Sequence, residues 1–168
     1  MATIQPGRFT AEFDDEVVVF LIGMRFNKPW KVRQWWPVFV AMPKMLRELQ
    51  QHPELGLLHV QGGLLSGQPL QVCYFRSIDH LTRFAKDPEL AHLEPWRAFN
   101  RKIAASGDVG IWHETYRVAP DRAESVYANM PRWGLGAATA TVPAGRKGNS
   151  AARRLGLSPT DEPAVAPY

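Results

Sequence analysis

One segment near the N-terminus, Asp15–Asn27, most restricts the folds open to this chain. It reads DEVVVFLIGMRFN, is rich in β-branched and aromatic residues, and is apolar at both odd and even positions. A strand with this pattern is buried on both of its faces. The chain must therefore provide a cover for each face of the sheet that contains this strand.

A helix and a hairpin are expected next. Beyond Pro29, apolar residues recur at spacings of four, three, four and three, which predicts one apolar helix face. These residues are Trp35, Phe39, Met42, Leu46 and Leu49. Pro37 and Pro43 are expected to divide or kink this helix, and His52-Pro53 to end it. Residues 57–76 then predict a β-hairpin that turns at Ser66-Gly67.

The second half of the chain predicts two more helices and two more strands. Ser77 is a good N-cap for a short helix through Lys86, and Asp87-Pro88 begins another helix that ends near Ala105. Residues 109–118 and 124–130 predict strands. Residues 134–168 are rich in Ala, Gly, Pro and Arg without a clear period, so we expect a tail that is mobile or wraps a partner.

The resulting order is β-α-β-β-α-β with one extra strand. This order indicates an α+β fold of the ferredoxin-like, split βαβ type within residues 1–133. Helices would cover one face of the sheet, and the simplest cover for the other apolar face is a second copy of the same sheet. We therefore predict a homodimer in which the two sheets face each other as a dimeric α/β barrel.

Composition excludes several classes of protein. Cys73 is the single cysteine, so neither an intrachain disulfide nor a cysteine-based metal cluster can form. There is no glycine-rich phosphate loop and no His-Glu-x-x-His motif. The net charge of +4 comes from scattered basic residues. A solvated surface or a carboxylate-bearing ligand accounts for it, and we expect no nucleic-acid partner.

The N-terminus and the apolar runs bear on localisation. The N-terminal residues lack the basic start and apolar run of a signal peptide. The longest apolar run, Val17–Met24, is too short to span a bilayer. We therefore expect a cytoplasmic protein with no membrane partner.

Two histidines are candidate functional residues, and the first lies in an aromatic stripe. His92, Trp96, Phe99 and Ile103 are spaced four, three and four residues apart, so they share one helix face. A buried histidine that makes one hydrogen bond and a ligand-binding imidazole are both compatible with this pattern.

The second histidine, His113, lies in the strand expected at 109–118. It shares a strand face with Ile111 and Thr115, whereas Glu114 belongs to the other face. His113 is therefore either an acid, base or substrate contact in a cavity, or simply a histidine at the end of a sheet. Glu114 would act outside the cavity.

Three polar residues near strand ends are further candidates. Tyr74 could donate a hydrogen bond to a ligand, and Arg76, two residues on, could bind a carboxylate. Asn27 could orient oxygen or a substrate carbonyl. A tyrosine packed between layers and an arginine at the strand mouth are the structural alternatives. The tryptophans at 30, 35 and 36 are assigned to the core and the dimer interface.

The order of these elements, together with several short motifs, resembles the dimeric α/β-barrel superfamily. The motifs are Tyr74-Phe75-Arg76-Ser77, Phe84-Ala85, His92, Trp96, Asn100 and the run Trp112-His113-Glu114-Thr115-Tyr116. This superfamily includes the antibiotic-biosynthesis and haem-degrading monooxygenases. More narrowly, the chain is similar to an antibiotic-biosynthesis-monooxygenase-like group with a fungal member from terpenoid biosynthesis. The resemblance covers about Glu12–Met130.

A second resemblance is to the haem domain of aldoxime dehydratases, which share this fold. His92 and the pair His113-Glu114 match their axial histidine and catalytic His-Glu motif in order and in similar spacing. Those enzymes are much longer, with two such domains in one chain. Their first domain supplies further catalytic residues, and nothing in this sequence matches these.

The resemblances imply a monooxygenase-like oxidoreductase that acts on a small apolar metabolite of secondary metabolism. They place the pocket between the sheet and the helices, lined by Tyr74, His92, Trp96 and His113. Haem is the implied cofactor, with His92 as the axial metal ligand, Trp96 and Phe99 beside it, and Arg76 on a propionate. A cofactor-free oxygenase, a haem lyase acting on a nitrogen–oxygen bond, and a non-catalytic haem or small-ligand carrier are the alternatives.

Overall fold

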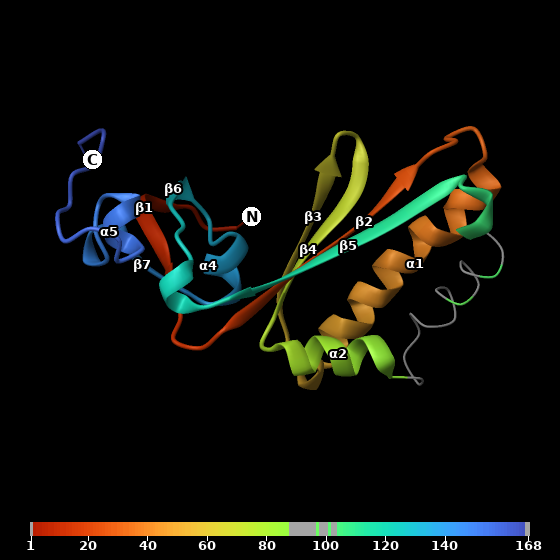
Figure 1. Ribbon diagram of the computed structural model, residues 1–168, viewed down its shortest axis with the longest axis horizontal. Helices are drawn as coiled ribbons and strands as arrows, with labels where there is room; N and C mark the ends of the chain where they lie inside the picture. The colour runs from red at the N-terminus through yellow and green to blue at the C-terminus, as the bar shows by residue number, and fades with distance from the viewer. Residues whose placement is uncertain (1, 88–96, 98–100, 102–103, 167–168) are drawn as a thin grey trace. The chain divides into compact units, whose positions relative to one another are not determined.

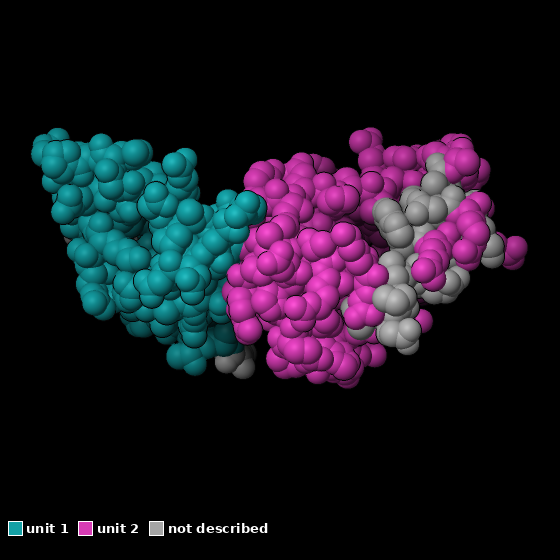
Figure 2. Space-filling view, turned by 60° about the horizontal axis from the view of Figure 1, so that its bottom comes forward, with its two compact units in different colours: residues 1–17, 117–168 teal, residues 18–116 magenta. Residues whose placement is uncertain are grey.

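The computed structural model describes residues 2–87, 97, 101 and 104–166. It divides into two compact units, which are coloured separately in Figure 2. We call Val18–Tyr116, magenta in Figure 2, the first unit, and we call the combination of Met1–Val17 with Arg117–Tyr168, teal there, the second unit. Each unit has its own sheet, and the candidate site lies within the first.

A four-stranded sheet forms the centre of the first unit (Figure 1). Its strands are β2 (Val17–Phe26), β3 (Leu57–Leu65), β4 (Gln68–Phe75) and β5 (Val109–Val118), in the order β3-β4-β2-β5. Strand β4 pairs antiparallel with β2 and with β3. The hairpin is therefore as predicted, and the predicted α+β class with a split βαβ arrangement is confirmed.

Two helices lie on the same side of this sheet, α1 (Val32–Gln51) and α2 (Ile78–Lys86) (Figure 1). Helix α1 runs through Pro37 and Pro43 as one element, so the expected division there does not occur. Ser77 caps α2 as predicted, because its Oγ accepts a hydrogen bond from the His80 backbone N–H at 3.3 Å.

The main core lies between this sheet face and the two helices. Its most deeply buried side chains are Val18, Leu49, Cys73 and Phe75, each less than 2% exposed. Leu81 and Phe84 of α2 complete it. Short 3₁₀ helices connect the elements at Pro53–Leu55 (η1), Ala104–Ser106 (η2), Pro120–Arg122 (η3) and Ala144–Arg146 (η4). Most of the helix expected between Asp87 and Ala105 falls outside the described residues.

The second unit contains a three-stranded antiparallel sheet that the sequence did not predict. Its order is β6-β1-β7, from β1 (Gln5–Glu12), β6 (Tyr127–Met130) and β7 (Ala140–Pro143). Residues 134–168, expected as a mobile or wrapping tail, instead supply β7 and two short helices, α4 (Gly134–Ala138) and α5 (Ala151–Arg154). The units divide after residues 17 and 116 rather than after 133.

Backbone pairing and one carboxylate explain why this C-terminal region is ordered. Strand β7 pairs with β1 from Phe9↔Pro143 to Glu12↔Ala140. Further on, Asp161 accepts hydrogen bonds from the backbone N–H groups of Asn149 and Ser150. These bonds lower the pKa of the Asp161 carboxyl. The pattern of hydrophobic residues does not predict such contacts, because backbone groups make them.

None of the helices in the described part of the chain is both long enough and apolar enough to cross a bilayer.

Candidate active site

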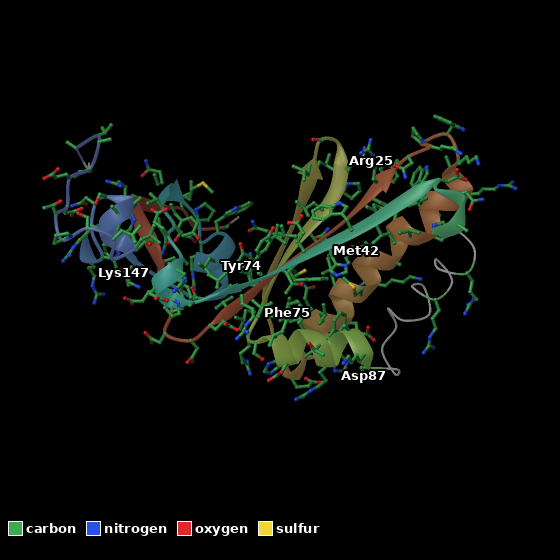
Figure 3. The ribbon with its side chains drawn as sticks, viewed as in Figure 1. Arg25, Met42, Tyr74, Phe75, Asp87 and Lys147 are labelled. Atoms are coloured by element: carbon green, nitrogen blue, oxygen red, sulfur yellow. The ribbon has the colours of Figure 1, made fainter. Side chains whose placement is uncertain are left out.

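A cavity of about 450 Å³ lies between the four-stranded sheet and the two helices of the first unit. We call it the sheet–helix cavity. The described residues that line it are Phe20, Ile22, Gly23, Met24, Val38, Ala41, Met42, Met45, Ile78, Leu81, Thr82, Phe84, Ala85, Ile111, His113 and Thr115. Met42, in the cavity wall, and Phe75, in the core next to it, are labelled in Figure 3. Its size fits a small organic ligand.

The local pattern of each element explains this lining. In β2 the even-numbered residues from Phe20 to Met24 face the helices, because side chains alternate along a strand. In β5 the odd-numbered residues from Ile111 to Thr115 do so. Helix α1 contributes residues spaced i, i+3, i+4 and i+7, from Val38 to Met45, which form one helix stripe.

His113 is the one ionisable side chain among the described residues that line the cavity. Its ring lies against that of Phe20, with centroids 5.7 Å apart and planes tilted by 40°. The other polar lining side chains in the described set are Thr82 and Thr115. His113 is also exposed to solvent, so the cavity presents one imidazole at an otherwise apolar wall.

Glu114 lies on the opposite face of β5 from His113, as the alternation predicts. Its Oε2 accepts a hydrogen bond from the Tyr116 hydroxyl at 2.5 Å. This hydrogen bond and the negative charge raise the pKa of Tyr116. The carboxylate is therefore engaged by the tyrosine two residues on.

Tyr74 does not join His113 in the cavity, contrary to the predicted pocket. Its neighbours Cys73 and Phe75 belong to the core under the helices, so the Tyr74 side chain lies on the other sheet face. There its ring is 6.1 Å from that of His59, and it is only 8% exposed. The predicted position of Tyr74 was wrong because successive side chains of a strand point to opposite faces of the sheet. Short sequence motifs do not give the register of a strand, and β4 pairs with β2 at Val19↔Tyr74.

Arg76 and Asn27 also lie outside the cavity lining. Arg76 follows β4, has an exposed side chain, and donates its backbone N–H to the Gly56 carbonyl. Asn27 is exposed, and its Nδ2 donates to the Gly107 carbonyl oxygen at 3.0 Å. Asn27 therefore joins the end of β2 to the loop before β5, and a contact with substrate in the cavity is not supported.

The proposed haem ligand His92, with Trp96 and Phe99, lies outside the described residues. Haem needs an axial ligand and cations for its propionates. Within the described part of the cavity wall there is one imidazole, His113, and no lysine or arginine. The described residues also contain no group of three or more metal-ligating side chains. The described residues do not by themselves make a haem site.

The sequence reasoning missed most of the cavity wall. It placed Met42 on an apolar helix face but did not single out Phe20, Met24 or Met45. The sequence could have indicated these residues through the alternation of side chains along a strand. The even-numbered residues of β2 and the odd-numbered residues of β5 face the same side of the sheet. Three methionines give the wall adaptable side chains that can fit ligands of different shape.

The family model and a curated relative point to one family. The family described as Monooxygenase af470-like matches residues 17–135. The curated protein Monooxygenase af470 of Aspergillus fumigatus is 32% identical over 151 residues, a match that covers 77% of this chain. The chain spans about half of that relative, 53% of its length. Among solved structures, protein SO0527 from Shewanella oneidensis is similar with a TM-score of 0.37 and 10% identity, over 76% of this chain and 100% of that one.

Proposed function

Because the chain belongs to the Monooxygenase af470-like family, we propose that it is a monooxygenase-type oxidoreductase acting on a small, mainly apolar metabolite of secondary metabolism. One structural observation supports this proposal in addition to the family membership. The sheet–helix cavity, of about 450 Å³, combines an apolar wall with a single described ionisable group, His113. Such a cavity suits an apolar substrate and one proton-transfer step.

In the proposed reaction His113 is the general base. The apolar wall removes the substrate from water, and the neutral imidazole takes a proton from an activated C–H or O–H group. The electron-rich anion then reduces molecular oxygen. For an activated methylene, the carbon becomes a carbonyl that keeps one oxygen atom, and the second oxygen atom leaves as water. The protonated His113 returns its proton to that departing oxygen.

Oxygen uptake tests this reaction. We expect purified protein to consume oxygen with an activated methylene ketone such as anthrone, and His113→Ala to lower kcat by about 10²–10⁴-fold. Equilibrium binding of the probe should change little, because the apolar wall remains. Glu114→Gln is the matched control on the other face of β5 and should keep its activity. Full turnover by His113→Ala would overturn the role of His113.

The haem version of the function stays a prediction that rests on His92. Its test is the visible spectrum of protein purified after haem supplementation. A Soret band that disappears in His92→Ala would support haem ligation, and colourless protein without haem affinity would remove it. If haem binds, oxygen uptake separates the oxygenase from the nitrogen–oxygen lyase, which consumes no oxygen. Bound haem without turnover would indicate a carrier.

A further inference from the structure

The outer face of α1 exposes aromatic and basic side chains together. We define this face as Trp30, just before the helix, with Val32, Arg33, Trp36, Phe39, Lys44 and Arg47. Trp30 is 73% exposed and Trp36 is 52% exposed. Large exposed aromatic side chains that gather on one surface mark an interaction site more often than a solvated surface.

Trp35, which is not part of this face, meets the rings of Trp36 and Phe39 edge-on. Trp35 packs on Phe26 with ring centroids 4.7 Å apart, and its indole Nε1 donates to the Pro29 carbonyl at 2.8 Å. Trp36 stacks on Phe39 at 5.9 Å with an interplanar angle of 29°. The opposite stripe of α1, from Val38 to Met45, already faces the sheet–helix cavity. The outer aromatic residues are therefore not part of the core.

The charge around this face is mainly positive, with Glu48 as the one acidic residue of α1. Residues 17–47 contain no Asp or Glu and hold six cations: Arg25, Lys28, Lys31, Arg33, Lys44 and Arg47. Two of these, Lys28 and Lys31, share the single carboxylate of Asp108. The segment keeps a net positive charge after this pairing, so a partner with negative charge is favoured.

The combination of indole rings and cations selects the kind of partner. Tryptophan is stable at a bilayer interface, where its ring meets acyl chains and its N–H meets headgroups, and lysine and arginine bind anionic headgroups beside it. A second copy of this chain is disfavoured, because a two-fold axis would bring the same cations against each other. We propose that the outer face of α1 docks on an anionic lipid surface.

This proposal replaces two sequence-based expectations. The sequence assigned Trp30 and Trp36 to the core and the dimer interface, and it indicated no membrane partner. Their exposed fractions could not be read from the sequence. Lipid docking is independent of the proposed oxygenase reaction, since its test needs no substrate.

Vesicle flotation with the full chain tests the proposal. We expect the protein to float with vesicles that mix phosphatidylcholine and phosphatidylserine, and to stay behind with phosphatidylcholine alone. Tryptophan emission should shift to the blue on binding, and added salt should weaken it. Trp30→Ala/Trp36→Ala should lower vesicle affinity by about tenfold or more. Arg33→Gln and Lys44→Gln should each lower it by about fivefold.

Matched variants keep the test specific. Leu64 and Leu65 are also exposed apolar residues, 75% and 54%, but lie in the β3–β4 hairpin. Leu64→Ala/Leu65→Ala should float like the parent, as should Arg122→Gln. Equal binding to neutral vesicles, or unchanged binding of the tryptophan variant, would overturn the proposal. So would light scattering that shows Trp36→Ala to dissociate a dimer, which would assign this face to a second copy.

Discussion

The His113 imidazole rests on the ring of Phe20, 5.7 Å away between centroids. The two side chains come from different strands of the sheet, β5 and β2, and both face the helices. Phe20 in turn meets Phe75 of the core edge-on, with centroids 6.5 Å apart. The position of the candidate base is therefore linked to the core through one aromatic side chain.

Replacing Phe20 should disturb His113 more than it disturbs the fold. We expect Phe20→Leu to reduce the free energy of unfolding by only about 1 kcal/mol, because the volume is nearly kept. The turnover number in the oxygen-uptake assay should fall by about tenfold, since the imidazole loses its aromatic support. Urea denaturation and oxygen uptake measure the two effects. Unchanged turnover with the same substrate would show that Phe20 does not position His113.

A side chain at Gly23 should destabilise the fold, because the Gly23 backbone lies close to the Trp112 ring. A Cβ atom added at Gly23 would lie 2.7 Å from the Trp112 indole, a rigid ring. We expect Gly23→Ala to lower the free energy of unfolding by about 1–3 kcal/mol, measured by urea denaturation. Gly63, with nothing within 4 Å of its added Cβ, is the control and should change it little. In Trp112→Ala the Gly23→Ala penalty should largely disappear.

The sequence allowed much of the first unit to be predicted, because hydrophobic period and capping residues act locally. The apolar run of β2, the turn at Ser66-Gly67 and the Ser77 cap all lie where expected. In the second unit the strand expected at 124–130 is present as β6, whereas β1 and β7 were missed because they pair over long separations. Strand β1 pairs with β7 over more than 120 positions, as in Phe9↔Pro143, and β7 has only four residues.

The candidate site was predictable only in part, for a different reason. The alternation of side chains along β5 places His113 and Glu114 on opposite faces of the sheet, and the sequence alone predicts this. Whether Tyr74 shares the face of His113 depends on how β4 pairs with β2, at Val19↔Tyr74. That register is set by tertiary packing, so a motif that names both residues cannot decide whether they meet.

Asp108 should make stability sensitive to acid. The buried carboxylate pairs with Lys28 Nζ at 2.8 Å and Lys31 Nζ at 2.7 Å, and these interactions lower its pKa. A lowered folded-state pKa stabilises the protein above the unfolded value, about 3.9, and this contribution is lost as pH falls through the folded value. Urea midpoints of the parent and Asp108→Asn should therefore differ at pH 7 and converge at low pH. Asp121→Asn, at an exposed site, is the control; a constant difference across pH would contradict this account.

Cys73 should react with thiol reagents only when the protein unfolds. Burial raises the pKa of its thiol to about 12, from 9.0. The thiolate fraction at neutral pH is then on the order of a thousandfold smaller than for a free cysteine, and the sulfur is 1% exposed. Labelling with a chromogenic disulfide reagent should be slow in buffer and complete in urea. Rapid labelling of folded protein would contradict the buried position of the thiol.

The face of the sheet turned away from the helices should mediate the predicted homodimer. Because the even-numbered residues of β2 face the cavity, Val19 and Leu21 point to this other face, where both are only partly buried. A second copy would cover them, so light scattering should give twice the chain mass of 18.9 kDa. Leu21→Arg should yield monomers because it buries a charge at the interface, whereas Leu64→Arg should stay dimeric. A parent protein that is monomeric at high concentration would rule out this assembly.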